Sequence, residues 1–351
     1  MAETRRVITI GLALAALLLA GAGADRSPSA PGSSLTRFEF AQAHMGTQFR
    51  IVVYAPDAAA AAQASAAAFE RVARLDATMS DYRETSELMV ACKQAARRWV
   101  RVSEDLFRVL ALSQQFARRS AGAFDVTVGP VVRLWRRARR QGELPDAEKL
   151  AAARRLVGYW RLRLDEGRRA MWLDRDGMRL DLGGIAKGYA ADAALAVLKA
   201  HGIGSALVAA GGDIVTGDAP PGEPGWTVAV RSLADDDEAM MIHLRLANAA
   251  ASTSGDAGQF VEIGGVRYSH IVDPRTGRAL TGRRSVTVVA PNGTASDALA
   301  TSASVLDAAR ARRLIDHTNG AAVRIERMQS DRLVVSESTR WHNLLALKTA
   351  R

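Results

Sequence analysis

The sequence of 351 residues contains a single cysteine, Cys92. A disulfide, a CxxC redox pair and a cysteine-rich zinc site all need more than one thiol, so none of them can form within one chain. The six histidines are spaced too widely for the HExxH pair of metalloproteases. The motifs GxGxxG, GxxxxGK[ST] and GxSxG are absent as well, which removes the usual signatures of dinucleotide, P-loop and α/β-hydrolase sites. The usual nucleotide-binding and hydrolase motifs are therefore not available to this chain.

Lysine is scarce, since 42 of the 47 basic residues are arginine, and the formal net charge is +10. The basic residues are concentrated between Arg133 and Arg169, where twelve of them stand against five acidic ones. A run of this kind is typical of a solvated helical face, and no nucleic-acid-binding module accompanies it. We therefore predict no nucleic-acid partner. Docking of an acidic partner or of a membrane surface is the alternative use of this strip.

The N-terminus has the layout of an export signal. A short basic region precedes an apolar run over residues 7–20 and a group of small residues. We predict a signal peptide at 1–24, a flexible tether at 25–37 and one folded domain at 38–345. The two arginines of the basic region suit the twin-arginine route as well as the general one, and either route predicts a periplasmic protein. An uncleaved anchor is the alternative, although the apolar run is short for a membrane span.

Apolar periodicity switches between helical and strand spacing along the chain. Helices are expected over 57–78 and over 103–119, the second begun by Ser103 as its N-cap. The turn residues Asp176 and Gly177 lie between two short apolar segments and predict a β-hairpin. Further expected elements are strands near 49–54, 205–209, 226–231, 241–247, 267–272, 285–290, 321–326 and 332–336, and a helix from Ser296. We predict an α+β fold with mixed, largely antiparallel sheets and packed helices.

The stretch from Leu180 to Asp192 is the feature around which the site is expected to form. It begins as an extended segment, breaks at Gly183-Gly184 and continues with helical spacing. A strand that ends at glycines and opens a helix leaves backbone N–H groups free to bind phosphate. Lys187 adds a positive charge in the first turn, and Asp181 offers an acceptor. Close packing of strand and helix explains the same glycines equally well.

Asp297 and Thr301 lie four residues apart and share one face of the expected helix. A carboxylate and a hydroxyl suit a hard cation such as Mg²⁺. Alternatively, Ser296 caps the helix, Asp297 complements the helix dipole and Thr301 is simply buried. His270 lies in an apolar alternation, where it is either a general base or a hydrogen-bonded core residue.

Several short motifs follow one another in a particular order. They are Met45-Gly46-Thr47, Met79-Ser80-Asp81-Tyr82, Phe124-Asp125-Val126-Thr127-Val128-Gly129-Pro130, Asp181-Leu182-Gly183-Gly184-Ile185-Ala186-Lys187-Gly188-Tyr189, Gly211-Gly212-Asp213, Ser254-Gly255-Asp256, Ser269-His270-Ile271-Val272-Asp273-Pro274-Arg275-Thr276-Gly277 and Ser296-Asp297-Ala298-Leu299-Ala300-Thr301. This ordered set strongly resembles the ApbE family of FAD:protein FMN transferases. The resemblance covers roughly residues 40–310, and so many ordered matches do not arise by chance.

The resemblance implies an ApbE-like (T-fold-like) architecture and a specific reaction. FMN is transferred from FAD to a threonine or serine of a target protein with Mg²⁺, and AMP leaves. Carried over residue by residue, the FAD contacts are Met45, Tyr82, Ala123, Phe124, Asp125, Asp181, Lys187 and Ile271. The Mg²⁺ ligands are the Gly184 carbonyl, Asp297 and Thr301. The catalytic residues are Asp297 and His270, the latter as base for the acceptor hydroxyl. The expected acceptor is a membrane-associated electron-transfer flavoprotein.

The sequence departs from the family pattern at two positions. Val126 stands where many members have proline, and Ala257 stands where an aromatic residue is usual. The second change affects the flavin pocket or the acceptor groove. Two other functions therefore stay open: an FAD pyrophosphatase that yields FMN and AMP, and a flavin-binding protein without turnover.

Overall fold

A computed structural model describes residues 35–233, 241–255, 260–329 and 332–345 of the chain. These residues belong to one compact unit that begins at Leu35. The expected signal peptide, nearly all of the tether, and Asp256 and Ala257 lie outside the described residues. Within the described ranges, no helix combines the length and apolar character that a membrane span requires.

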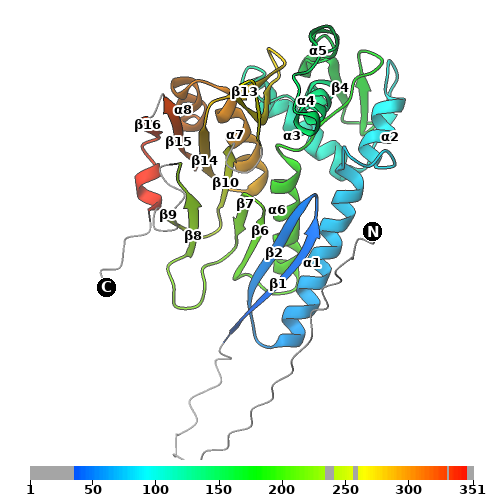
Figure 1. The fold of residues 1–351 in the computed structure, drawn as a ribbon. Coiled ribbons are helices and arrows are strands. Elements are labelled where there is room, and N and C mark those ends of the chain that lie inside the picture. Colours follow the sequence, from blue (N-terminus) through cyan, green and yellow to red (C-terminus); the bar gives the residue numbers. More distant parts are fainter. Residues whose placement is uncertain (1–34, 234–240, 256–259, 330–331, 346–351) are drawn as a thin grey trace, which may run out of the picture. The chain divides into compact units, whose positions relative to one another are not determined.

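The unit is built on a sheet of eight strands in which every neighbouring pair is antiparallel. In spatial order the strands are β1 (Thr36–His44), β2 (Thr47–Ala55), β6 (Ala206–Ala210), β7 (Asp213–Thr216), β10 (Ala250–Gly255), β14 (Arg284–Ala290), β15 (Ala322–Gln329) and β16 (Arg332–Glu337). Figure 1 shows the strands from β1 to β16 across the molecule. The predicted α+β fold with largely antiparallel sheets is confirmed.

Side chains alternate along the central strands between two hydrophobic cores. Ile51 and Val53 of β2 enter the larger core, whereas Val52 between them enters the smaller one. The same alternation on β6 separates Val208 from Leu207. Successive side chains of a strand point to opposite faces of the sheet, so a strand that is buried on both faces carries apolar residues facing both ways.

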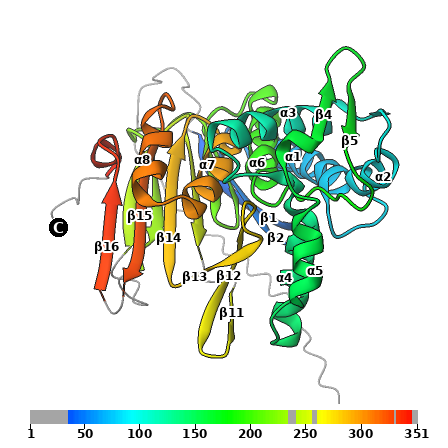
Figure 2. The same ribbon diagram turned by 90° about the horizontal axis from the view of Figure 1, so that it is seen from above.

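Each face of the sheet has its own cover. Helices α1 (Ala58–Met79), α6 (Ala186–Ala200), α7 (Gly293–Val305) and α8 (Ala308–Asp316) pack on the side of the larger core (Figure 2). The hairpin of β8 (Trp226–Arg231) and β9 (Met241–Leu246) covers the other side, together with the short helix η4 (Trp341–Leu344). The helix-covered side is the one that carries the cavity described below.

Additional elements extend this helical side. They are α2 (Glu87–Gln94), α3 (Glu104–Arg119), η1 (Val126–Val128), α4 (Gly129–Gln141), α5 (Ala147–Arg154), η2 (Tyr159–Arg161), a sheet of β3 (Val100–Arg101), β5 (Ala170–Leu173) and β4 (Leu162–Asp165), and a sheet of β11 (Phe260–Ile263), β12 (Val266–Asp273) and β13 (Arg278–Thr281). A third core joins α4 and α5 to β12 and β13. Trp135 of α4 lies against Tyr268 of β12 with ring centroids 5.3 Å apart, and its indole N–H donates to the Gly277 carbonyl at 2.9 Å. These contacts fix α4 beside β12.

Most of the expected elements form, but the hairpin at Asp176-Gly177 is wrong. The turn is present, with Gly177 at a φ of +81°, yet the segment after it is not a strand. β5 already pairs with β4 on one edge and β3 on the other. The segment from Met178 to Leu182 instead runs extended toward the cavity, where the Asp181 amide donates to the Val126 carbonyl at 2.8 Å.

Candidate functional site

The site is centred on the start of α6, where this helix crosses α7. Gly183 and Gly184 form a turn, and α6 begins at Ala186 without a side-chain N-cap. The Gly188 amide instead donates to Asp297 Oδ2 on α7 at 3.2 Å. A Cβ on Gly188 would lie 2.9 Å from the Asp297 Cβ and 2.5 Å from the Gly293 carbonyl carbon. The glycine thus allows two helices to meet backbone to backbone beside the predicted phosphate site.

The beginning of α7 differs from the prediction. The helix starts at Gly293, and Asn292 is its N-cap, accepting from the Ala295 amide at 2.8 Å. Ser296 therefore lies inside the first turn, where its hydroxyl is 2.7 Å from that of Ser252. The alternative in which Ser296 caps the helix is wrong, because a side chain that can accept the capping hydrogen bond stands four residues earlier.

Asp297 is buried in a cluster with Lys187 and Asp213. Lys187 Nζ lies 3.0 Å from Asp213 Oδ2 and 3.6 Å from Asp297 Oδ2. It also donates to the Gly183 carbonyl at 3.2 Å. Burial and the neighbouring Asp213 carboxylate raise the pKa of Asp297 to about 7, against the opposing effect of Lys187. Two carboxylates share one ammonium group, so the cluster can accommodate a further positive charge.

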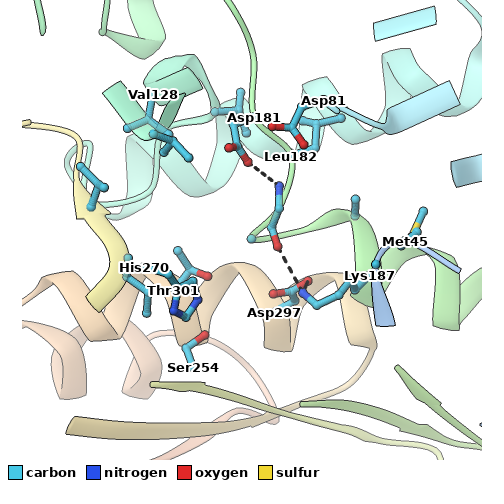
Figure 3. A pocket seen from close by; sticks show the side chains of 18 of the residues that line it. Met45, Asp81, Val128, Asp181, Leu182, Lys187, Ser254, His270, Asp297 and Thr301 are labelled. Carbon is cyan, nitrogen blue, oxygen red and sulfur yellow. Dashed lines mark hydrogen bonds and ion pairs between the residues drawn. The ribbon is translucent and has the colours of Figure 1, made fainter. Parts of the chain in front are cut away.

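Gly184 and Thr301 lie against each other in the same region. A Cβ on Gly184 would be 2.8 Å from Thr301 Oγ1, so only glycine brings the backbone to the hydroxyl at this distance. Thr301, His270 and Ser254 lie on one side of the cavity in Figure 3, and Asp181, Leu182 and Asp81 lie on the opposite side. Within the described ranges, no three His, Cys, Asp or Glu side chains gather as a metal site. A cation here would need hydroxyl and carbonyl oxygens, and oxygens from its ligand, in addition to Asp297.

The opposite wall is formed by a second charged cluster. Arg136 of α4 is ion-paired with Asp81, and its Nη2 lies 2.8 Å from Asp181 Oδ2. The same guanidinium lies over the Tyr82 ring, 4.3 Å from the centroid. Burial and the Asp181 carboxylate raise the pKa of Asp81 to about 6, although Arg136 acts in the opposite direction.

These walls enclose a cavity of about 710 Å³, within the size range of small-molecule sites, roughly 300–1,000 Å³. Every residue expected to bind FAD or metal or to act in catalysis lines it: Met45, Tyr82, Ala123, Phe124, Asp125, Asp181, Gly184, Lys187, His270, Ile271, Asp297 and Thr301. The structure thus brings together residues that are up to 256 positions apart in the sequence.

The aromatic and acidic members of this set differ in how they are presented. Tyr82 is 74% exposed, whereas Phe124 is 3% exposed and packs edge-on against Phe116. Asp125 is buried, and its Oδ1 accepts from the Thr127 amide at 2.8 Å and from the Thr127 hydroxyl at 2.7 Å. Burial raises the pKa of Asp125. Tyr82 therefore offers an accessible ring surface, while Asp125 shapes the loop that carries Phe124.

The arginine run in α4 is only partly the solvated face that the sequence predicts. Arg136 and Arg139 line the cavity together with Val128 and Val132. The four positions are spaced by four, four and three residues, which is one face of a helix. That spacing was the signal available in the sequence. The exposed arginines of the same helix are Arg133, Arg137 and Arg140.

The chain is similar to proteins of a known family over most of its length. Residues 45–325 match the model of the ApbE family. A FAD:protein FMN transferase from Klebsiella pneumoniae is 32% identical over 307 residues, covering 86% of this chain and 87% of the relative. One from Treponema pallidum is 33% identical over 285 residues, covering 76% of this chain and 79% of the relative.

Solved structures agree. The flavin transferase ApbE from Vibrio cholerae superimposes with a TM-score of 0.79 at 27% identity, covering 89% of this chain and 100% of the other. The flavinyl transferase ApbE from Pseudomonas stutzeri in its apo form gives a TM-score of 0.78 at 26% identity, covering 89% and 97%. The similarity therefore extends over most of this chain.

Proposed function

Because this chain belongs to the ApbE family, we propose that it is a FAD:protein FMN transferase. Its relatives of that name match most of its length. The structural observation that supports the proposal is the cavity itself, where all the residues expected for FAD, metal and catalysis meet. The enzyme binds FAD there and transfers the FMN part to an acceptor protein.

The transfer is a phosphoryl displacement at the FAD pyrophosphate. The hydroxyl oxygen of an acceptor threonine or serine forms a bond to the phosphorus of the FMN half. The bond from that phosphorus to the bridging oxygen breaks, and AMP leaves with the electron pair. We assign His270 as the base that takes the hydroxyl proton, since it lines the cavity on the same side as Thr301.

The residues at the α6–α7 crossing fit Mg²⁺. Asp297, the Thr301 hydroxyl and the Gly184 carbonyl would hold it, because hard oxygen donors suit this ion and Gly184 lies directly against Thr301. The ion would neutralise pyrophosphate charge and polarise the phosphorus. Lys187 favours the ionised form of Asp297 and stays within reach of the phosphate oxygens, since it lines the same cavity.

The proposal also includes the acceptor protein and the cellular location. The acceptor is a membrane-associated electron-transfer flavoprotein, and the enzyme works in the periplasm after export by its N-terminal signal. The signal-like order of residues 1–24 supports this location. Fractionation of cells that express the full chain tests it: we expect a periplasmic protein that starts at Asp25. A full-length cytoplasmic protein would contradict the export proposal.

Substitution of Asp297 by asparagine tests the chemistry. Asparagine keeps the volume of the side chain and an acceptor for the Gly188 amide but removes the charge. We expect FMN attachment and AMP release to fall at least about 100-fold, with the thermal unfolding midpoint nearly unchanged. Asp316→Asn is the matched control, since Asp316 is exposed at the end of α8. Full FMN transfer by the Asp297→Asn enzyme would refute the metal assignment. AMP release by the unmodified enzyme without FMN on the acceptor would favour the pyrophosphatase function.

A further inference from the structure

Arg136 connects three parts of the cavity wall that come from distant segments. It pairs with Asp81, which follows α1, and with Asp181, which precedes the Gly183–Gly184 turn, and it lies over the Tyr82 ring. The arginine and both carboxylates are largely buried, with exposed side-chain fractions of 18%, 16% and 9%. One guanidinium group therefore contacts all three neighbours.

The charge balance at this wall depends on Arg136. The Asp81 and Asp181 carboxylates lie on either side of the guanidinium, so its loss would leave the negative charge of this wall without the cation that now compensates it. FAD carries a doubly charged pyrophosphate, which such a wall would repel. Arginine keeps its charge at every relevant pH, so the compensation is permanent. Arg139 also lines the cavity, and its charge stays when Arg136 is replaced. We therefore expect only a partial loss of FAD affinity.

Arg136 also determines the geometry of two FAD contacts. The Tyr82 ring is 74% exposed, and the Arg136 guanidinium lies over it at 4.3 Å from the centroid, a contact that favours one orientation of the ring. Asp181 is held from two sides, by Arg136 Nη2 at 2.8 Å and by the Gly183 amide at 2.8 Å on its other oxygen. The arginine is thereby linked to the turn that carries Gly184 and leads to Lys187.

We propose that Arg136 is a positioning residue for FAD. It holds Tyr82 and Asp181 in place and cancels one carboxylate charge, so that an anionic dinucleotide can bind. This inference rests on the proposed FAD transfer. It predicts an effect on FAD binding and on KM rather than on kcat, since Arg136 acts through its neighbours and not on the reacting phosphorus.

The test compares FAD affinity and transfer kinetics among single and double variants. Arg136→Met removes the charge and keeps a long side chain, and it is expected to raise the FAD Kd and KM about tenfold or more while kcat changes less than threefold. Asp81→Asn in the Arg136→Met background removes one of the unpaired charges and is expected to restore most of the affinity. Arg140→Met is the control, because Arg140 is exposed on the same helix.

Arg136→Lys keeps the charge without the planar fork, so an intermediate Kd is expected; it also provides the measurement if Arg136→Met does not fold. The proposal would be overturned if Arg136→Met bound FAD as tightly as the unmodified enzyme does. If Arg136→Met does not fold, the same result for Arg136→Lys would overturn it. A double variant no better than Arg136→Met would overturn the charge compensation. Binding is measured by flavin fluorescence without acceptor, so failure of transfer in the unmodified enzyme leaves this test intact. An unmodified enzyme that does not bind FAD would overturn both proposals.

Discussion

Replacing Gly188 by alanine tests the helix crossing that builds the site. In an ordinary helix interior this change stabilises a protein by about 1 kcal/mol, since alanine loses less backbone entropy than glycine. Here the new methyl would lie 2.5 Å from the Gly293 carbonyl carbon and 2.9 Å from the Asp297 Cβ. The first distance is roughly 1 Å short of ordinary contact. Backbone atoms cannot rotate away, so α6 and α7 must separate.

Two opposing effects of Gly188→Ala therefore determine the change in the free energy of unfolding. Overpacking against a fixed neighbour costs typically about 1–3 kcal/mol, occasionally more, and this position falls at the upper end because the atoms met are backbone. The gain in helix propensity offsets about 1 kcal/mol of it. We expect a net loss of about 1–2 kcal/mol in the free energy of unfolding. Transfer activity should fall further, since separation moves Asp297 away from the Gly188 amide and from Lys187.

Urea denaturation of the two proteins, followed by circular dichroism, measures the difference. Ala196→Gly is the control in the same helix: Ala196 is exposed, so the reverse change should cost about 1 kcal/mol and leave transfer unaffected. A Gly188→Ala protein that is more stable than the unmodified one, and fully active, would refute the close crossing.

Three further changes test other contacts. Asp192 of α6 accepts from two backbone amides at the start of α7, at 2.6 and 2.8 Å, so Asp192→Ala should lower the free energy of unfolding by about 1–2 kcal/mol in urea; an unchanged value would show that these two hydrogen bonds contribute nothing. Burial and a neighbouring carboxylate raise the pKa of Asp81 to about 6 from 3.8, so the folded chain binds more protons than the unfolded chain in this interval. The free energy of unfolding should therefore fall as pH rises from about 4 to 6. Urea titrations at several pH values should show a weaker dependence of this free energy on pH for Asp81→Asn; an equal dependence in both proteins would count against the raised pKa. Trp135→Phe removes the donor to the Gly277 carbonyl and should cost about 1–2 kcal/mol, whereas an unchanged thermal midpoint would show that this bond contributes nothing.

Local patterns in the sequence predicted local structure well. The helix over 103–119 forms as α3, and the Ser103 hydroxyl accepts from the Leu106 amide at 3.3 Å. The strand at 226–231 forms as β8 over the same residues. Both depend on periodicity and capping, which act within a few residues. The hairpin at Asp176-Gly177 failed because the partners of β5 come from elsewhere in the chain, and a turn sequence does not report them.

The site was predictable as a set of residues but not as a set of contacts. Ordered motifs identified Lys187 and Asp297, yet nothing local shows that Lys187 would pair with Asp213 as well. Arg136 was missed because an arginine-rich helix resembles a solvated one unless the positions facing the cavity are known. These contacts join segments far apart in sequence, so they follow from the packing of α4, α6 and α7 and not from any one stretch.

Covalent attachment of FMN to another protein is measured most directly by the intact mass of an acceptor domain after incubation with the enzyme, FAD and Mg²⁺. We expect a mass increase equal to FMN, lost when the acceptor threonine is replaced by alanine and absent with the Asp297→Asn enzyme. Release of AMP with no change in acceptor mass, or bound FAD with neither AMP nor adduct, would contradict the account.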